Sequence, residues 1–255
     1  MKKIFVFDFD GTLTHADTLL AFIRFACGPV RMCMGFVLYA PLLVLMKLKL
    51  YPNYKAKQKV FAHFFRGMTL TRFDALCTAF AQQGEHLLRP AARSFINTVR
   101  SEAYAMAIVS ASIDNWVRPF AEMYLQSDNA QDKSQGNAQD KSQGNVQDNT
   151  KDNKPSSPII VLGTKVEIDA AGCLTGRFST PNCYGPEKVR RIEAVWPHRE
   201  QYDVSAFGDS RGDKEMLAYA DQGYFKPFRF WCVPSFPIFF FIPFCSLNLL
   251  IYDEK

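Results

Sequence analysis

The sequence predicts an α/β protein with a Rossmann-like parallel sheet and an inserted helical cap. Two observations carry this prediction. Short apolar runs recur along the chain and each ends at a polar or glycine-bearing segment, which is the pattern of buried parallel strands. Residues 15–88 lack such runs and instead carry apolar residues at helical spacing. We therefore expect a core formed by residues 1–14 and 89–229, with residues 15–88 as the cap.

The expected strands of the core are short, apolar and followed by turn residues. They span residues 4–7, 106–109, 158–162 and 204–207. Helical stretches separate them, so the sheet should be parallel and covered on both faces. Two further strands, at 165–168 and 174–178, flank a turn at Gly172 and predict a β-hairpin. Ligands of parallel sheets bind beyond the carboxyl ends of the strands, so polar residues there are the candidates for function.

One segment of the cap is unusually apolar. Residues 32–46 carry no charge and lie between Arg31 on one side and Lys47 and Lys49 on the other. The run is shorter than the roughly 20 residues that span a bilayer. Two interpretations are open: a helix buried inside the cap, or a helix that contacts a membrane.

Two other segments do not fit the pattern of the core. Residues 129–136 recur verbatim at 137–144. This low-complexity insert, at about 127–157, has too few apolar residues to offset the entropy of ordering, and we expect a disordered loop. Residues 230–255 form an apolar tail, uncharged up to its last three residues and interrupted by three prolines. Its length suits a membrane segment, whereas its prolines disfavour a regular helix.

Composition narrows the class of partner. The net charge of +5 could favour anionic partners, but the basic residues are scattered, so we do not expect nucleic-acid binding. The seven cysteines include no pair at C-x-x-C spacing and indicate reduced thiols rather than a zinc site. The apolar run at residues 4–7 is too short for a signal peptide. We expect a cytoplasmic protein. If the cap helix or the tail contacts lipid, this contact would hold the protein at the inner face of the cell membrane.

Two carboxylates follow the first strand. Asp8 and Asp10 stand directly after it, beside Gly11. One carboxylate can attack phosphorus, while its neighbour protonates the leaving oxygen and later activates water. Adjacent carboxylates also need a cation to relieve their repulsion, and Mg²⁺ prefers carboxylate and phosphate oxygens. The motif therefore predicts magnesium-dependent phosphate chemistry, with Asp8 as nucleophile and Asp10 as general acid and base.

Three further segments supply candidate residues. Asp209 and Asp213 follow the fourth strand at a spacing that puts both on one side of a helical turn. Asp209 would hold the metal and Asp213 would support it, with helix capping as the alternative role for Asp213. Ser110 follows the second strand, where its hydroxyl could hold a phosphate oxygen or simply cap a turn. Lys188 follows a Gly-Pro turn and could neutralise a transferring phosphoryl group, although most lysines are only solvated.

Together these segments resemble the motifs of the haloacid dehalogenase (HAD) superfamily. They are, in order, Asp8-Phe9-Asp10-Gly11-Thr12-Leu13-Thr14, Val109-Ser110-Ala111-Ser112, Gly185-Pro186-Glu187-Lys188 and Gly208-Asp209-Ser210-Arg211-Gly212-Asp213. The helical segment between the first two motifs is similar to the cap of the phosphoserine phosphatase-like subgroup, subfamily IB. The resemblance covers about residues 3–229.

The resemblance implies the HAD fold and a role for each motif residue. Asp8 would be the nucleophile and Asp10 the general acid and base, with phosphate contacts from Ser110 and Lys188. Mg²⁺ would be held by Asp8, Asp209 and the main-chain carbonyl of Asp10. An aspartate at position 10 favours a phosphatase over a dehalogenase, because only an alcohol leaving group needs that acid.

The substrate is less closely defined by the resemblance. Asp17 stands where phosphoserine phosphatases carry a glutamate that contacts the ammonium group of the substrate, so phosphoserine itself is in question. The apolar cap stretch at residues 28–51 is also similar to bacterial phosphatidylglycerophosphate phosphatases, which work at the inner membrane. We therefore expect a phosphate monoester substrate that is either a small molecule or a lipid.

Two alternative functions and the nature of the tail stay open. An aspartyl phosphate can be discharged by any hydroxyl that reaches it, so the protein could be a phosphotransferase to an acceptor alcohol. It could also be a membrane-associated, non-catalytic protein with a HAD-like fold. The tail beyond Arg229 lies outside the family pattern and is either an appended anchor or a non-native extension.

Overall fold

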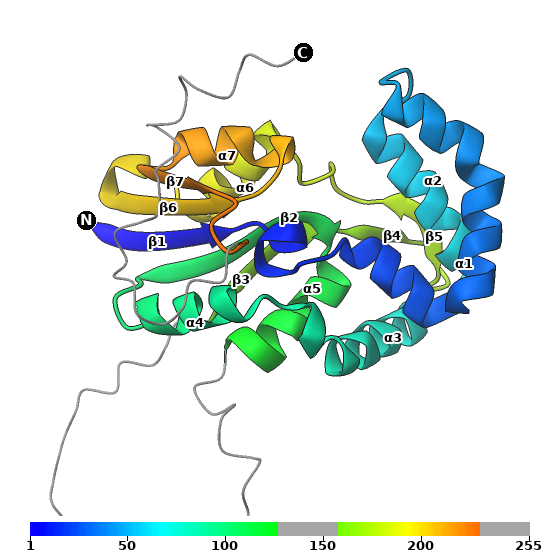
Figure 1. The fold of residues 1–255 in the computed structure, drawn as a ribbon, viewed down its shortest axis with the longest axis horizontal. Helices are drawn as coiled ribbons and strands as arrows, with labels where there is room; N and C mark the ends of the chain where they lie inside the picture. Colours follow the sequence, from blue (N-terminus) through cyan, green and yellow to red (C-terminus); the bar gives the residue numbers. More distant parts are fainter. Residues whose placement is uncertain (127–157, 230–255) are drawn as a thin grey trace, which may run out of the picture.

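A computed structural model describes residues 1–126 and 158–229, so the low-complexity insert and the apolar tail lie outside the described residues. Five parallel strands form one sheet in the order β3-β2-β1-β6-β7 (Figure 1). They are β1 (Lys2–Phe7), β2 (Ala105–Ile113), β3 (Ile160–Thr164), β6 (Tyr202–Gly208) and β7 (Gln222–Phe225). The predicted fold class is confirmed, with β1 between β2 and β6 at the centre of the sheet.

Helices cover both faces of this sheet, because the strands are apolar on both sides. In β1, Ile4 and Val6 pack with residues of α6 (Pro186–Val195) and α7 (Lys214–Tyr219). Phe5 and Phe7 point to the opposite face, where α4 (Pro90–Val99) and α5 (Asp114–Phe120) lie (Figure 1). The carboxyl ends of β1, β2 and β6 are left at one edge of the sheet.

Three strands differ from the sequence expectation. The strand expected at 158–162 is β3, two residues further along the chain. The second strand was expected to end at residue 109, with Ser110 just after it, but β2 continues to Ile113. Hydrogen bonds of Ser110 and Ser112 account for the difference, since these hydroxyls satisfy polar groups inside a buried segment. The edge strand β7 was not predicted, because its four residues lack an apolar run.

The region between the first two core strands forms α1 (Thr18–Lys47), α2 (Asn53–Phe65) and α3 (Leu70–Gln83). The chain leaves and re-enters the core through paired linkers. The N–H of His15 donates to the carbonyl of Leu87 at 3.0 Å, and the N–H of Arg89 donates to the carbonyl of Leu13 at 2.8 Å. The two linkers therefore form one connection between the helices and the sheet.

The hairpin of β4 (Val166–Ile168) and β5 (Leu174–Phe178) forms a separate two-stranded sheet, and β5 packs against α2. The N–H of Gly67, just after α2, donates to the carbonyl of Leu174 at 2.8 Å. A Cβ on Gly176 would lie 2.6 Å from that of Ala62, so glycine permits this close approach. Segments far apart in sequence thus build one layer above the strand ends.

An aromatic cluster joins this layer to the core. Phe22 of α1 is fully buried and stacks on Trp116 of α5 with ring centroids 5.0 Å apart. Its other ring neighbours, at 5.2 to 5.6 Å, come from α2 and α3: Phe65, Phe73 and Phe80. Phe22 therefore touches both the helical layer and the helix that covers the sheet.

Replacing Phe22 with alanine should lower the free energy of unfolding by about 3 to 5 kcal/mol, because the cavity opens at a junction of four rings. Leu20→Ala is the matched control, since Leu20 lies in the same helix and is 44% exposed. It should change stability by less than about 1 kcal/mol. Urea unfolding followed by circular dichroism measures both, and equal losses would show that the aromatic junction is not what holds the layers.

Candidate active site

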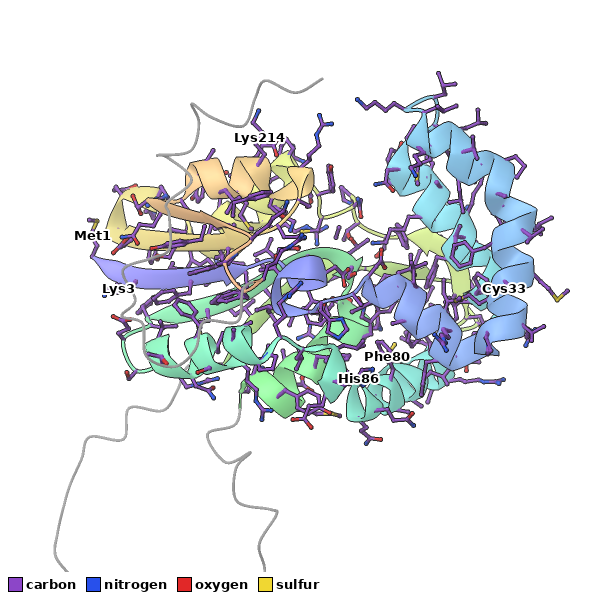
Figure 2. The ribbon with its side chains drawn as sticks, in the orientation of Figure 1. Met1, Lys3, Cys33, Phe80, His86 and Lys214 are labelled. Carbon is purple, nitrogen blue, oxygen red and sulfur yellow. The ribbon has the colours of Figure 1, made fainter. Side chains whose placement is uncertain are left out.

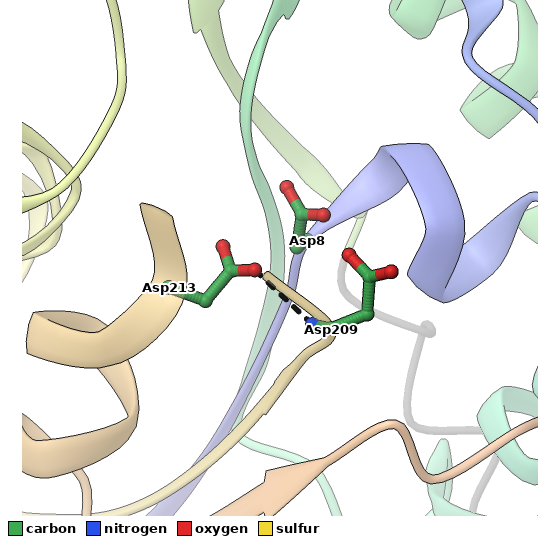
Figure 3. Close-up of side chains that lie close together, drawn as sticks. All are labelled: Asp8, Asp209 and Asp213. Atoms are coloured by element: carbon green, nitrogen blue, oxygen red, sulfur yellow. Dashed lines mark hydrogen bonds between the residues drawn. The ribbon is translucent and has the colours of Figure 1, made fainter. Parts of the chain in front are cut away.

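Three carboxylates converge at the carboxyl ends of β1 and β6 (Figure 3). Asp8 follows β1, while Asp209 and Asp213 follow β6. Each contributes one oxygen to a group whose members lie within 4.8 Å of one another. Asp8 and Asp213 are buried, and the N–H of Asp8 donates to the carbonyl of Phe207 at 2.8 Å. Strand pairing between β1 and β6 therefore brings the carboxylates together.

Lys188 lies between two of these carboxylates. Its Nζ donates to Asp8 Oδ1 and to Asp213 Oδ1, both at 2.6 Å, and its side chain is 2% exposed. The residue sits in the first turn of α6, which begins after Gly185 at a φ of +61°. The N–H of Gly185 donates to the carbonyl of Gly212 at 2.9 Å, which ties this helix start to the loop after β6. A single buried cation thus links two acidic segments.

Burial and neighbouring charges shift the pKa values of Asp8, Lys188 and Asp213. It raises the pKa of Asp8 to about 7, with Lys188 acting in the opposite direction and Asp213 adding to the rise. Burial also acts against the charge of Lys188, but Asp8 and Asp213 outweigh it and raise the pKa of that lysine. The pKa of Asp213 is lowered, because Lys188 and the Ser210 hydrogen bonds outweigh burial. One buried cation thus serves two buried carboxylates, with contacts of equal length to each.

Asp213 shapes the loop that carries Asp209. Its Oδ2 accepts hydrogen bonds from the N–H of Asp209 at 3.1 Å, the N–H of Ser210 at 2.9 Å and the Ser210 hydroxyl at 2.8 Å. Ser210 in turn caps the short helical turn Arg211–Asp213. Asp213 thus completes the capping box of Ser210 and fixes the backbone of the loop that carries Asp209.

Asp209 lies beside the loop after β1. Gly11 there has a φ of +82°, and a Cβ on it would stand 2.4 Å from Asp209 Oδ2. Glycine is thus required both by the backbone conformation and by the approach of the carboxylate. The same Oδ2 accepts from the guanidinium of Arg229 at 2.6 Å.

The donor set fits a magnesium ion. Asp8, Asp209 and Asp213 offer hard oxygen atoms within a small space. Among residues 1–126 and 158–229, the cations paired with them are the buried Lys188 and the partly exposed Arg229. Asp8 Oδ2 has only a long contact, 3.5 Å from the Thr12 hydroxyl, and so has capacity for a further partner. Asp8 and Asp209 are the residues best placed to hold such an ion.

The Asp10 carboxylate is engaged elsewhere. Its Oδ1 accepts from the N–H of Thr18 at 3.0 Å and from the Thr18 hydroxyl at 2.6 Å, and its Oδ2 accepts from the Ser112 hydroxyl. A metal contact from Asp10 would therefore have to use its main-chain carbonyl, as the family resemblance implies. Burial raises the pKa of this carboxyl, with a further rise from the charge of Asp17.

Two residues that the sequence predicted for the site, Ser110 and Asp17, accept hydrogen bonds from backbone N–H groups. Ser110 is buried in β2, and its Oγ accepts from the N–H of Ser112 at 3.1 Å, which leaves the hydroxyl proton for another acceptor. The carboxylate of Asp17 accepts from the N–H groups of Leu19 at 2.9 Å and Leu20 at 3.3 Å. Asp17 is thus the N-cap of α1, a role the sequence analysis did not assign to it.

Sequence reasoning missed Lys57 on α2. Its Nζ donates to the carbonyl of Ala111 at 2.6 Å, at the end of β2. Burial lowers its pKa, and the nearby carboxylates of Asp10, Asp17 and Asp8 oppose that shift. The sequence presents Lys57 as one of several lysines in a basic stretch. A usable signal was its spacing from Val60 and Phe61, which are buried and share its face of the helix.

Thr18 and Ser112 were also not singled out, although both hold Asp10. The Thr18 hydroxyl accepts from the Trp116 indole N–H at 3.1 Å, so it is fixed from the core side as well. Thr18 is the first residue of α1 and Ser112 belongs to β2. No local pattern distinguishes such residues, because their role arises only when the helix is seated on the sheet.

Replacing Lys188 with methionine should lower the free energy of unfolding by about 3–5 kcal/mol, because two buried carboxylates lose their cation. The loss should shrink as the pH falls, since carboxyls without that cation have raised pKa values and take up protons. Arg190→Met, on the same helix and 74% exposed, should cost less than about 1 kcal/mol. Denaturant unfolding without divalent cations measures both, and a loss independent of pH would contradict the ion-pair account.

Comparison with known proteins places this geometry in a family. The model of the haloacid dehalogenase-like hydrolases matches residues 5–141 and 158–218. Protein CicA of Caulobacter vibrioides is 30% identical over 226 residues, which cover 88% of this chain and 85% of that protein.

Solved structures share the fold. A protein of unknown function from Bordetella pertussis Tohama I superposes with a TM-score of 0.65 at 13% identity, covering 88% of this chain and 89% of that one. A phospho-aspartyl intermediate analogue of phosphoserine phosphatase gives a TM-score of 0.51 at 17% identity, covering 88% and 85%. With the family model matching most of its length and the motif residues gathered at one sheet edge, the chain belongs to the haloacid dehalogenase-like hydrolases.

Proposed function

We propose that the protein is a magnesium-dependent phosphatase that forms a phospho-aspartate on Asp8. The proposal rests on the different surroundings of two carboxylates, Asp8 and Asp10. Asp8 faces Lys188 and the acidic cluster, whereas Asp10 is held apart by Thr18 and Ser112. The structural relative described as a phospho-aspartyl intermediate analogue of phosphoserine phosphatase supports the same chemistry.

In the first step, Asp8 Oδ2 attacks the phosphorus of a phosphate monoester. The new bond joins this oxygen to phosphorus, and the bond to the alcohol oxygen breaks as Asp10 gives that oxygen a proton. The raised pKa of Asp10 favours the protonated carboxyl that this step needs. In the second step Asp10 takes a proton from water, whose oxygen attacks phosphorus and releases phosphate and the Asp8 carboxylate.

Other groups would stabilise the charge of the transferring phosphoryl group. Lys188 Nζ lies against Asp8, and the Ser110 hydroxyl proton can be donated to a phosphoryl oxygen. A magnesium ion held by Asp8, Asp209 and the Asp10 carbonyl would supply positive charge to the phosphoryl oxygens. The core of residues 1–14 and 89–229 would carry this machinery, and the cap of residues 15–88 would cover it.

The substrate is a small or a lipid phosphate monoester. The position of Lys57 favours a leaving group with acceptor oxygens, because its ammonium reaches from α2 to the Ala111 carbonyl near the end of β2. Asp17 remains a candidate for contact with the substrate beyond its capping role.

The five cysteines within residues 1–126 and 158–229 are free thiols, which supports a cytoplasmic location.

Transfer of the phosphoryl group to an acceptor alcohol is the main rival reaction. Adding glycerol to the assay distinguishes the two, because transfer releases more alcohol from the substrate than inorganic phosphate. The non-catalytic alternative is disfavoured by the complete set of acidic motif residues.

Asp8→Asn should reduce turnover of an aryl phosphate at least about a thousandfold, because an amide cannot attack phosphorus. Asp203→Asn, on β6 at the end of the strand away from the cluster, is the matched control and should keep wild-type activity. Phosphate release with Mg²⁺ and with a chelator measures the effect. More than a few per cent activity in Asp8→Asn, or turnover unaffected by the chelator, would overturn the proposal.

Thr18→Val should lower kcat about tenfold or more. The substitution removes the hydroxyl that hydrogen-bonds Asp10 Oδ1 and orients this carboxyl group. Thr18→Ser keeps the hydroxyl and should restore most of the rate. KM should change little in both variants, since Asp10 acts on the reacting bond. An equal loss in the valine and serine variants would indicate a packing effect instead.

A further inference from the structure

The helix α1 is apolar on two opposite sides. It is interrupted at Gly28, and beyond that residue one side packs on α2. Phe36 meets Phe64 with ring centroids 6.4 Å apart, and Tyr39 meets His63 at 5.3 Å. This inner side accounts for the position of α1 and leaves the outer side without a packing partner in the described ranges.

The outer α1 face consists of exposed apolar residues at regular helical spacing. Its members are Val30, Met34, Val37, Leu38, Val44, Leu45 and Leu48. Val37 is 75% exposed, and Cys33 beside it projects away from the molecule (Figure 2). A helix on the surface of a soluble protein carries polar residues on this side. Of residues 32–46 only Gly35 is buried, so the buried-helix interpretation of this run is wrong.

Charge around this face has one sign. Residues 18–73 include nine lysines and arginines and no aspartate or glutamate. Arg31 lies near the start of the outer α1 face, and Lys47 and Lys49 lie at its end, all exposed. Within residues 18–73, an apolar stripe flanked by cations complements a surface of anionic headgroups over acyl chains.

The fold favours a helix lying on the membrane over one that crosses it. By length and composition alone, α1 qualifies as a candidate span. However, α2 runs beside α1 and exposes Asn53, Lys55, Lys59 and His63, which would be carried into the hydrocarbon. Only the outer side of α1 can enter lipid while α2 stays in water.

We propose that the outer α1 face docks onto an anionic bilayer, with its apolar residues at the boundary between headgroups and acyl chains. Arg31, Lys47 and Lys49 contact the lipid phosphates. A second copy of the chain is disfavoured as the occupant of this face, because pairing two such caps would bring like charges together. The proposal goes beyond the phosphatase chemistry and does not depend on it.

The test is co-sedimentation of the full chain with vesicles of phosphatidylcholine, alone or mixed with phosphatidylglycerol. Wild type should bind the mixed vesicles and only weakly the neutral ones. The double variant Val37→Asp, Leu38→Asp should bind the mixed vesicles at least about tenfold less, because two charges face the acyl boundary. The matched control is Tyr104→Asp, Ile168→Asp, at two exposed apolar residues elsewhere, and it should bind as wild type does.

A second variant guards against misfolding of the first. Lys47→Gln, Lys49→Gln leaves the apolar face intact and should weaken binding roughly fivefold for each charge removed. All variants should keep the turnover of a soluble aryl phosphate, which separates this proposal from the catalytic one. Equal vesicle binding of wild type and the Val37, Leu38 variant would overturn the proposal. Equal binding of wild type to neutral and anionic vesicles would overturn it as well. So would a wild-type dimer that dissociates in the Val37, Leu38 variant, if neither protein binds vesicles.

Discussion

The contact of Lys188 with Asp8 and Asp213 is the interaction on which the rest of the site depends. The buried Lys188 Nζ lies 2.6 Å from each of two buried carboxylates, and removing the lysine leaves both without their buried cation. The lysine comes from α6 and the carboxylates from the ends of β1 and β6, so this contact fixes the distance between three segments. With one Asp213 oxygen held by Lys188, the other is free to accept the N–H groups that shape the Asp209 loop.

A second constraint couples the helical layer to the chemistry. Thr18 is the first residue of α1, and its hydroxyl joins the Asp10 carboxylate to the Trp116 indole. Phe22, one turn further on, stacks on the same Trp116. The orientation of the proposed acid and the seating of the helices on the core therefore share one anchor, and movement of α1 would release Asp10. If Asp10 is the proton donor, its orientation would therefore depend on how α1 is seated on the core.

The sequence predicted what depends on local pattern and missed what depends on how the layers meet. Strands at residues 4–7 and 204–207 were recognisable because their apolar runs end in carboxylates, and parallel strands bring those ends to one edge. The extent of β2 was underestimated because Ser110 and Ser112 look like turn residues, although the Ser110 Oγ accepts from the Ser112 N–H and the Ser112 hydroxyl donates to Asp10. The spacing of Lys57 from Val60 and Phe61 places it on the apolar face of its helix, but only the packing of α2 shows that it reaches the strand ends.

Charge is divided between the two layers in a way that links the site to its surroundings. The strand ends gather carboxylates, whereas residues 18–73 of the helical layer carry only cations, with Lys57 at the junction. Acidic residues at the strand ends would by themselves repel a phosphate ester. The field of a basic layer above them would oppose that repulsion and would raise the local concentration of an approaching anion. The same field would hold the layer against anionic headgroups, so a phosphate ester presented at such a surface would meet attraction from the surface of the cap down to Lys188.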